Sequence, residues 1–165
     1  MGEIVKFVRC RPDAKVPTRA HIGIPGDVGF DLYSVEYTKI LPLQRVLICT
    51  GIRLQMPDGM YCHIEDKSGL ASKNGLHVLG GQIDTIYRGE IKVILFNSTF
   101  NIQDIIDVIQ PNAYTSMFGS RSSYTVEPGQ KIAQIIFSPY FIPEFVEVDE
   151  LEETERNENG FGSSG

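Results

Sequence analysis

Apolar and polar residues alternate over 60–66, which predicts a half-buried β-strand. Met60, Cys62 and Ile64 fall on one face of this strand and are expected to point into a core. His63 falls on the opposite face, so it is expected on the solvent side or at the rim of a cleft rather than as a metal ligand.

Runs of β-favouring residues separated by Gly- and Pro-containing turns indicate further strands. Helical patterns are limited to two short stretches. Ser68 is suited to cap the first, which Asn74 or Gly75 would end. In the second, isoleucines recur at helical spacing over 102–109 and Pro111 would stop the helix. The other expected strands are 3–9, one within 26–34, 45–56, 91–97, one within 129–137, and 145–148.

The stretch 80–97 predicts a β-hairpin whose loop carries one carboxylate and one aromatic ring. Gly80 and Gly81 open it, a turn follows, and a β-branched run closes it. Asp84 lies where the chain turns, so its carboxylate can be held at the rim of a cleft. Tyr87 can offer its ring face to a ligand on the same side. The alternative is an ordinary surface hairpin, because aspartate is common in turns for its own hydrogen bonding.

Three other stretches carry polar groups suited to an anionic ligand. Lys67, Ser68 and Gly69 stand at a helix start after a strand, where unpaired N–H groups favour a phosphate, although a plain helix cap explains them equally well. Gln134 is a polar amide within an apolar strand and needs a hydrogen-bond partner. Residues 156–165 combine Arg, Phe and Ser among glycines, which suits a lid that wraps phosphates or, equally, a disordered terminus.

Composition limits the classes of partner. The 165 residues suffice for one domain, and 15 basic against 21 acidic residues give a net charge of −6. Without a basic excess, non-specific binding to nucleic acid or to a membrane surface is not expected. The three cysteines form no CxxC pattern, so we expect reduced, mostly buried thiols. No signal peptide or membrane-spanning run is visible, and we expect a soluble protein of the cytoplasm, or of the host cytoplasm for a phage or viral protein.

Five stretches, taken in chain order, closely resemble the five motifs of the homotrimeric dUTPase (dUTP pyrophosphatase) family. They are Asp31 after its glycines, Lys67-Ser68-Gly69, the stretch with Asp84 and Tyr87, Gln134 on its strand, and the Gly/Ser/Phe tail. The most specific are Gly81-x-Ile83-Asp84-x-x-Tyr87-x-Gly89 and Gly160-Phe161-Gly162-Ser163-x-Gly165. The resemblance implies an all-β fold, a jelly-roll-like β barrel with a short helix near 68–74. It also implies a single domain over 1–150 and a flexible C-terminal tail over 151–165.

The same resemblance implies the reaction. In this family dUTP and water yield dUMP and pyrophosphate, which limits uracil incorporation into DNA and supplies dUMP for thymidylate synthesis. Mg²⁺ is expected on the triphosphate and its waters, with no ligands from protein side chains. Three active sites would lie at the subunit interfaces of a homotrimer, each closed by a tail that usually comes from another subunit.

Individual residues match family positions with known roles. Asp84 matches the carboxylate that orients and deprotonates the attacking water, and Asp31 matches a supporting residue. Tyr87 matches the ring that packs under the deoxyribose and excludes a 2′-hydroxyl by steric clash. The remaining substrate-binding matches are Gly81, Gln82, Ile83 and Lys92 at the uracil, Lys67, Ser68, Gly69 and Gln134 at the phosphates, and Arg156, Phe161, Gly162, Ser163 and Ser164 in the closing tail.

The chain also departs from the family pattern. Asp66-Lys67 stands where the family usually has Pro-Arg, and this aspartate is expected to weaken the local positive field. Gln130-Lys131 replaces the usual Asp-Arg, and Asn157 and Asn159 stand where glycines are common. An inserted segment at about 98–125 resembles that of certain phage members. In some of them it contacts a repressor, so a regulatory protein partner for this segment is an open alternative.

Two other functions stay open on the sequence alone. A dCTP deaminase has this fold but needs a glutamate on the strand after the hairpin, where the candidates here are Ile94 and Leu95. A catalytically weak dUTP-binding module, acting in regulation or protein interaction, is favoured only by the unusual Asp66-Lys67 pair. No GxSxG or GxxxxGK[ST] motif is present, which argues against a hydrolase triad and a P-loop.

Overall fold

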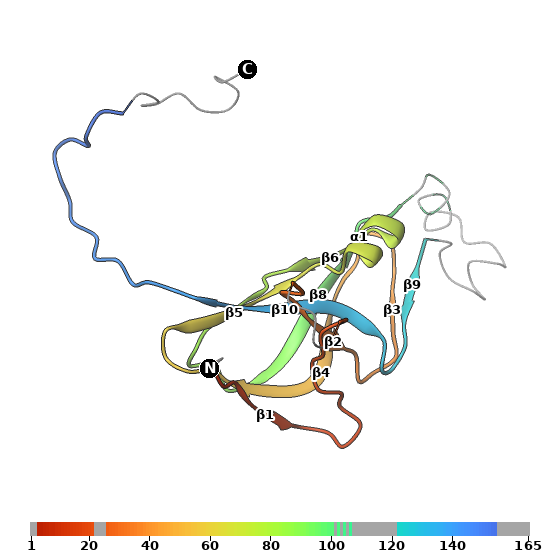
Figure 1. The fold of residues 1–165 in the computed structure, drawn as a ribbon. Coiled ribbons are helices and arrows are strands. Elements are labelled where there is room, and N and C mark those ends of the chain that lie inside the picture. The colour runs from red at the N-terminus through yellow and green to blue at the C-terminus, as the bar shows by residue number, and fades with distance from the viewer. Residues whose placement is uncertain are drawn as a thin grey trace.

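The computed structural model describes residues 3–21, 26–100, 102, 104, 106 and 122–154. Within these residues β-strand is the main regular structure, and the strands lie in three sheets with the orders β1-β4-β8-β6, β2-β10-β5-β7 and β3-β9 (Figure 1). The elements are β1 (Lys6–Arg9), β2 (Phe30–Tyr33), β3 (Thr38–Ile40), β4 (Arg45–Gln55), β5 (Met60–Glu65), α1 (Ser68–Asn74), β6 (Leu76–Leu79), β7 (Gln82–Ile83), β8 (Glu90–Asn97), β9 (Tyr124–Val126) and β10 (Lys131–Pro139).

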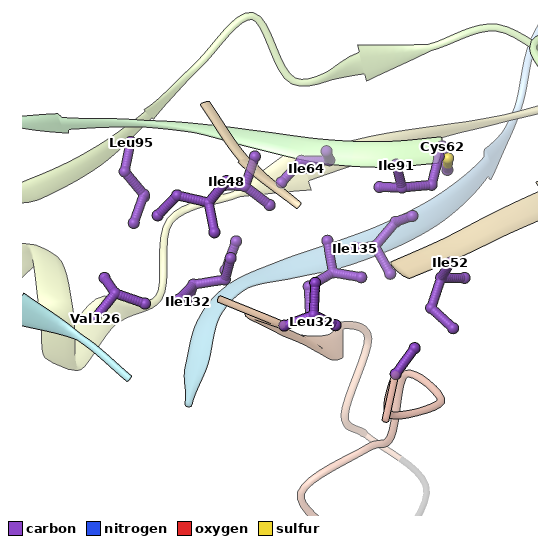
Figure 2. Packing of buried hydrophobic residues seen from close by; sticks show 14 of the residues in the cluster. Leu32, Ile48, Ile52, Cys62, Ile64, Ile91, Leu95, Val126, Ile132 and Ile135 are labelled. Carbon is purple, nitrogen blue, oxygen red and sulfur yellow. The ribbon is translucent and has the colours of Figure 1, made fainter. Parts of the chain in front are cut away.

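Branched aliphatic side chains from all three sheets fill one core (Figure 2). Ile48 and Ile91 come from the first sheet, Leu32 and Ile135 from the second, and Val126 from the third. None of these five exposes more than 1% of its surface. Burying such a side chain contributes about 1.5–3 kcal/mol, so the shared core holds the sheets in fixed relative positions.

The all-β, jelly-roll-like prediction is confirmed, although hydrogen bonds group the described strands into three sheets rather than one closed barrel. The alternation over 60–66 forms β5, with Cys62 and Ile64 buried as predicted. The apolar run over 45–56 forms β4. The first strand is shorter than expected and covers only Lys6–Arg9.

The predicted hairpin over 80–97 is wrong in its pairing. β7 pairs with β5 in the second sheet, whereas β8 pairs with β4 and β6 in the first. The reason is burial. β8 turns Ile91, Val93 and Leu95 into the core, and in this position it pairs along the long strand β4 beside it. The turn between β7 and β8 therefore connects two sheets.

The predicted strand over 145–148 is also wrong. These residues have no strand conformation, and Phe145 and Val146 are 95% and 72% exposed. The chain after β10 runs away from the body of the strands (Figure 1). No strand within the described chain pairs with it.

The helix near 68–74 is observed as α1, and Gly75 with a φ of 61° ends it. The prediction that Ser68 caps it is wrong, because Ser68 is already helical and Lys67 occupies the cap position without a side-chain cap bond. In the segment 98–125, Ile102, Asp104 and Ile106 are helical, in line with the isoleucine spacing. The stretch 107–121, which includes Pro111, lies outside the described residues.

The three cysteines are free thiols. Cys62 is buried, and burial raises the pKa of its thiol to about 12. Cys10 is exposed, so the expectation of mostly buried thiols fails there. Among the described residues, no helix has both the length and the apolar character needed to cross a membrane.

Candidate active site

The turn after β7 presents Asp84 to solvent on an anchored backbone. The N–H of Tyr87 donates to the carbonyl of Asp84 at 3.1 Å, which closes the turn. The next residue, Thr85, is buried, and its hydroxyl donates to the carbonyl of Met60 at 2.6 Å. Asp84 itself is exposed, and its carboxylate accepts no hydrogen bond from the described part of the chain. The backbone of Asp84 is thus anchored, while its carboxylate is exposed and accepts no hydrogen bond from the described residues.

Asp84 lines a cavity of about 830 Å³ at the end of the second sheet. Gln82 of β7 and Tyr61 of β5 form part of its wall, together with Tyr140, which follows β10. The rings of Tyr61 and Tyr140 pack edge to face, with centroids 6.4 Å apart. An aromatic wall beside a free carboxylate suits a ligand with one flat apolar part and one reactive polar part.

Close backbone contacts explain two glycines around this turn. A Cβ on Gly81 would overlap the carbonyl of Ile64, whose N–H in turn donates to the carbonyl of Gly81 at 2.8 Å. A Cβ on Gly89 would overlap the phenol of Tyr87. The Tyr87 hydroxyl donates to the carbonyl of Glu90 at 3.1 Å, so its ring is folded back over Gly89. The Tyr87 side chain nevertheless stays 44% exposed and does not line the Asp84 cavity.

A second group of polar residues surrounds Asp31 in β2. Its carboxylate is only 3% exposed and ion-pairs with two lysines, Lys67 at 2.8 Å and Lys131 at 2.6 Å. Burial alone would raise the pKa of this carboxyl, but the contacts with Lys131 and Lys67 outweigh it and lower the pKa below its usual value. Asp31 is therefore ionised and holds both ammonium groups at one place.

Gln134 joins this second group through the sheet. In β10 it lies opposite Asp31 of β2 and Glu65 of β5. Its side chain packs against Gly29, where an added Cβ would come within 2.7 Å of its Oε1. Within the described residues no hydrogen bond reaches its amide, so the partner that the sequence called for is not supplied by this part of the chain.

Lys67, Ser68 and Gly69 form the start of α1 beside Asp31. The carbonyl of Lys67 accepts the N–H groups of Leu70 and Ala71, at 2.8 and 3.0 Å, which sets the first turn. Ser68 and Gly69 are exposed. The side chain of Lys67 is directed to Asp31 rather than to the neighbouring Asp66.

The two groups lie apart in one chain. Asp31 and Gln82 belong to the two edge strands of the second sheet, β2 and β7, with two strands between them. Three strand spacings correspond to about 14 Å. Lys92 lies in the other large sheet, on β8 opposite Cys49 of β4, with its side chain exposed. One subunit thus brings together Lys67, Asp31 and Gln134, and separately Gln82, Ile83 and Asp84, but does not join the two sets.

The tail residues Arg156, Phe161, Gly162, Ser163 and Ser164 lie outside the described residues. For metals, the described residues contain no group of three or more His, Cys, Asp or Glu side chains that could hold an ion.

Three residues of these groups were missed by sequence reasoning. Lys131 was noted only as a departure from a motif, yet it is the second cation on Asp31. Tyr61 and Tyr140 line the Asp84 cavity although they lie 23 and 56 residues from Asp84 in the chain. The charge of Lys131 next to an apolar strand was a usable signal, whereas the two tyrosines had none.

The chain is similar to known proteins over nearly its whole length. The family model for dUTPase matches residues 14–107 and 109–165. A deoxyuridine 5′-triphosphate nucleotidohydrolase of Clostridium novyi is 42% identical over 154 residues, with 92% of each chain covered.

Solved structures of phage proteins share the fold. One is the dUTPase of Staphylococcus bacteriophage 80alpha with dUpNHpp, described for the control of virulence-gene transfer by phage dUTPases. It superposes with a TM-score of 0.81 at 26% identity, with 98% of each chain covered. The dUTPase of phage phi11 of S. aureus, as a mutant described for the coordination of a structural Mg(II) ion, gives a TM-score of 0.75 at 23% identity, covering 91% of this chain and 99% of that one.

Proposed function

The chain belongs to the dUTPase family and is a dUTP nucleotidohydrolase, and we propose that it cleaves dUTP at sites assembled between the subunits of a homotrimer. The observation that carries this proposal is the separation of the Asp84 group from the Asp31 group on opposite edges of one sheet. Each group is half of a site in the family pattern. A neighbouring subunit that apposes the two edges would complete it.

Asp84 is the general base in this proposal. It accepts a proton from the attacking water, the bond between the α- and β-phosphates breaks, and dUMP and pyrophosphate leave. An anchored backbone supports this role, together with a carboxylate that accepts no hydrogen bond from the described residues, because a base must be positioned and still available for the proton. No side-chain nucleophile is needed, since positioning and charge stabilisation account for catalysis.

The phosphates bind at the other group. Lys67, Ser68, Gly69 and Gln134 contact the triphosphate, while Asp31 keeps Lys67 in place. The amide of Gln134 supports the assignment, because it receives no hydrogen bond from the described residues and a polar group on a packed strand needs a partner, which the ligand would supply.

Mg²⁺ fits this group as an ion carried mainly by the substrate. The donor set around Asp31 is one carboxylate between two ammonium groups, which is too poor in oxygens for a cage made of protein alone. When bound, the ion neutralises charge on the triphosphate. Phosphate oxygens and waters would supply most of its ligands.

Uracil and deoxyribose bind at the turn. Backbone groups of Gln82 and Ile83, with those near Lys92, pair with the uracil edge, and the Tyr87 ring packs against C2′ and excludes a 2′-hydroxyl. The fixed ring position over Gly89 supports this role, since a mobile ring would reject UTP poorly. The tail residues Arg156, Phe161, Gly162, Ser163 and Ser164 close over the nucleotide.

The segment after β10 supports the trimer. Phe141, Ile142 and Phe145 are 92%, 85% and 95% exposed. Apolar side chains in such a run are costly in water, and an adjacent subunit would cover them. The same segment leads the chain toward its C-terminal tail, so a tail that closes over a neighbouring subunit follows from the proposal.

For the segment at 98–125 we propose a regulatory protein partner, because the chain resembles phage dUTPases.

The test is pyrophosphate release from dUTP, UTP, dCTP and dTTP in parallel, with Mg²⁺ and with EDTA, together with the mass of the protein in solution. Mg²⁺-dependent release from dUTP alone by a trimer is the expected result. Release of ammonia from dCTP would establish a deaminase instead. Binding of dUTP without release would establish the catalytically weak binding module.

A further inference from the structure

Asp66 connects the phosphate-binding loop to the opposite sheet. It lies between β5 and α1, one residue before Lys67. Its Oδ1 accepts the N–H of Val78 at 2.5 Å, and its Oδ2 lies 2.8 Å from Nδ1 of His77. Both partners are consecutive residues of β6, so one carboxylate contacts the backbone and a side chain of the same strand.

Among the described strands β6 lies at the edge of its sheet and pairs only with β8. Edge strands carry N–H groups that no neighbouring strand can accept. The Asp66 carboxylate supplies the acceptor for Val78, which makes the contact charge-assisted and stronger than an ordinary hydrogen bond. The chain leaving β5 in the second sheet is thereby fixed to the first sheet just before α1 begins.

This contact has consequences on both sides of Asp66. On one side Lys67 follows directly, and its carbonyl sets the first turn of α1. On the other side Asp66 lines a cavity of about 480 Å³ together with Gly80, Gly81 and Gln82, which lead into the Asp84 turn. Asp66 thus lies between the loop assigned to the phosphates and the strand assigned to uracil.

The proline usual at this position in the family restrains the chain through its ring. Asp66 has no such ring, and the expectation was that its charge would weaken the positive field of Lys67. In the structure its carboxylate is engaged by His77 and Val78, while the Lys67 ammonium binds Asp31. Two hydrogen bonds therefore take the place of a covalent restraint.

We propose that Asp66, through His77 and Val78, is a positioning residue that holds Lys67, Ser68 and Gly69 where they receive the triphosphate. The inference rests on the proposed function. It assigns no catalytic step to Asp66, since Asp66 acts only through the residues that follow it.

The test compares binding of dUMP with binding of the non-hydrolysable imido analogue of dUTP, and KM with kcat. In Asp66→Ala the analogue should bind about tenfold more weakly, the scale of one lost charge-assisted hydrogen bond, while dUMP affinity changes by less than about twofold. KM for dUTP should rise by a similar factor with kcat within about threefold of wild type. Asp66→Asn keeps an acceptor for Val78 and should lose only about two- to threefold for the analogue.

Glu65→Ala is the matched control. Glu65 is the preceding residue, and its carboxylate lies 2.8 Å from Nδ1 of His63 in a pair of the same kind. Among the described residues its side chain makes no hydrogen bond or ion pair with β6, so neither ligand should change its affinity. Equal weakening of dUMP and the analogue in Asp66→Ala, or no weakening of either, would overturn the proposal.

If Asp66→Ala does not fold, Asp66→Asn and His77→Phe decide the matter. Asp66→Asn removes the charge from both contacts and His77→Phe removes one of them, and each should lower the ratio of analogue affinity to dUMP affinity by about two- to threefold. An unchanged ratio in both would overturn the role of Asp66. The binding comparison needs no turnover, so a wild-type protein that binds the analogue without cleaving dUTP would count against the proposed function alone.

Discussion

Asp31 and Asp84 are carboxylates with opposite surroundings. Asp31 is 3% exposed and ion-paired with Lys67 and Lys131, and these charges lower its pKa. Asp84 is exposed on an anchored turn, without a side-chain hydrogen bond from the described residues. The first carboxylate is committed to holding charges together, whereas the second is free to take a proton. Their surroundings, more than their residue type, favour a structural role for Asp31 and the proposed chemical role for Asp84.

The same contrast bears on assembly. The ion pairs of Asp31 form within one chain and link β2, β10 and the start of α1. The Asp84 group is open, with a cavity bordered by Tyr140 and by Phe141 of the exposed segment after β10. A closed half and an open half within one subunit are what a site shared between subunits requires.

Loss of the Asp84 carboxylate should have the largest effect on activity. Asp84→Asn keeps the size of the side chain but removes the proton acceptor, so kcat should fall by at least about 10²-fold. Affinity for the imido analogue and the melting temperature should stay near wild type, because the carboxylate accepts no hydrogen bond from the described residues. Single-turnover hydrolysis measures the loss of rate, titration with the analogue measures the affinity, and thermal unfolding gives the melting temperature. Near-wild-type turnover would remove Asp84 from the mechanism.

Asp31→Asn should reverse that pattern, with a clear loss of stability. Removing the carboxylate leaves two ammonium groups close together without their counter-charge. A fully buried pair would cost about 3–5 kcal/mol on loss of one partner, but the lysines are 26% and 43% exposed, so about 1–3 kcal/mol is expected. Urea unfolding gives the value.

Asp13→Asn is the control for this loss, since Asp13 pairs with Arg11 at the surface and its removal should have little effect. Should Asp31→Asn be as stable as wild type while losing kcat as strongly as Asp84→Asn, the division of roles between the two carboxylates would be wrong.

A smaller effect is expected at Gly89. In Gly89→Ala the new Cβ overlaps the phenol of Tyr87, so the ring must move from its present position. Discrimination between dUTP and UTP should fall by about tenfold, the scale of a modest steric contact, with kcat for dUTP less affected. Steady-state kinetics with both nucleotides give the ratio.

Much of this arrangement was readable from local pattern. Alternation over 60–66 predicted β5 with its buried face, and the glycine after residue 74 marked the end of α1. These features depend on neighbours in sequence, so the sequence contains their causes. The candidate residues Asp31, Lys67 and Gln134 were found through ordered motifs, and the structure brings them together.

The failures share a physical cause, which is that strand pairing depends on distant residues. Local glycines suggested a hairpin over 80–97, but β8 pairs with the distant strand β4 and therefore lies in the other sheet. Phe145 to Val148 have strand-forming residues and no partner within the described chain. Lys131 was undervalued for the same reason, since its contact is with Asp31, one hundred residues earlier.

The smallest expected effect is on how the stability difference between wild type and Asp31→Asn changes at low pH. Because the folded-state pKa of Asp31 is lowered, its ion pairs stabilise the fold above the unfolded value of about 3.9, and this contribution is lost as the pH falls through the lower, folded pKa. The stability difference between wild type and Asp31→Asn should therefore be constant from about pH 5 to 7 and shrink below about pH 4. Urea unfolding of both proteins across that range measures it. Asp27, whose pKa is lowered by hydrogen bonds from the backbone and ring of His21, contributes equally to both proteins and cancels in the difference. A difference that grew in acid would mean that Asp31 is protonated in the folded protein, and the contrast with Asp84 would then rest on burial alone.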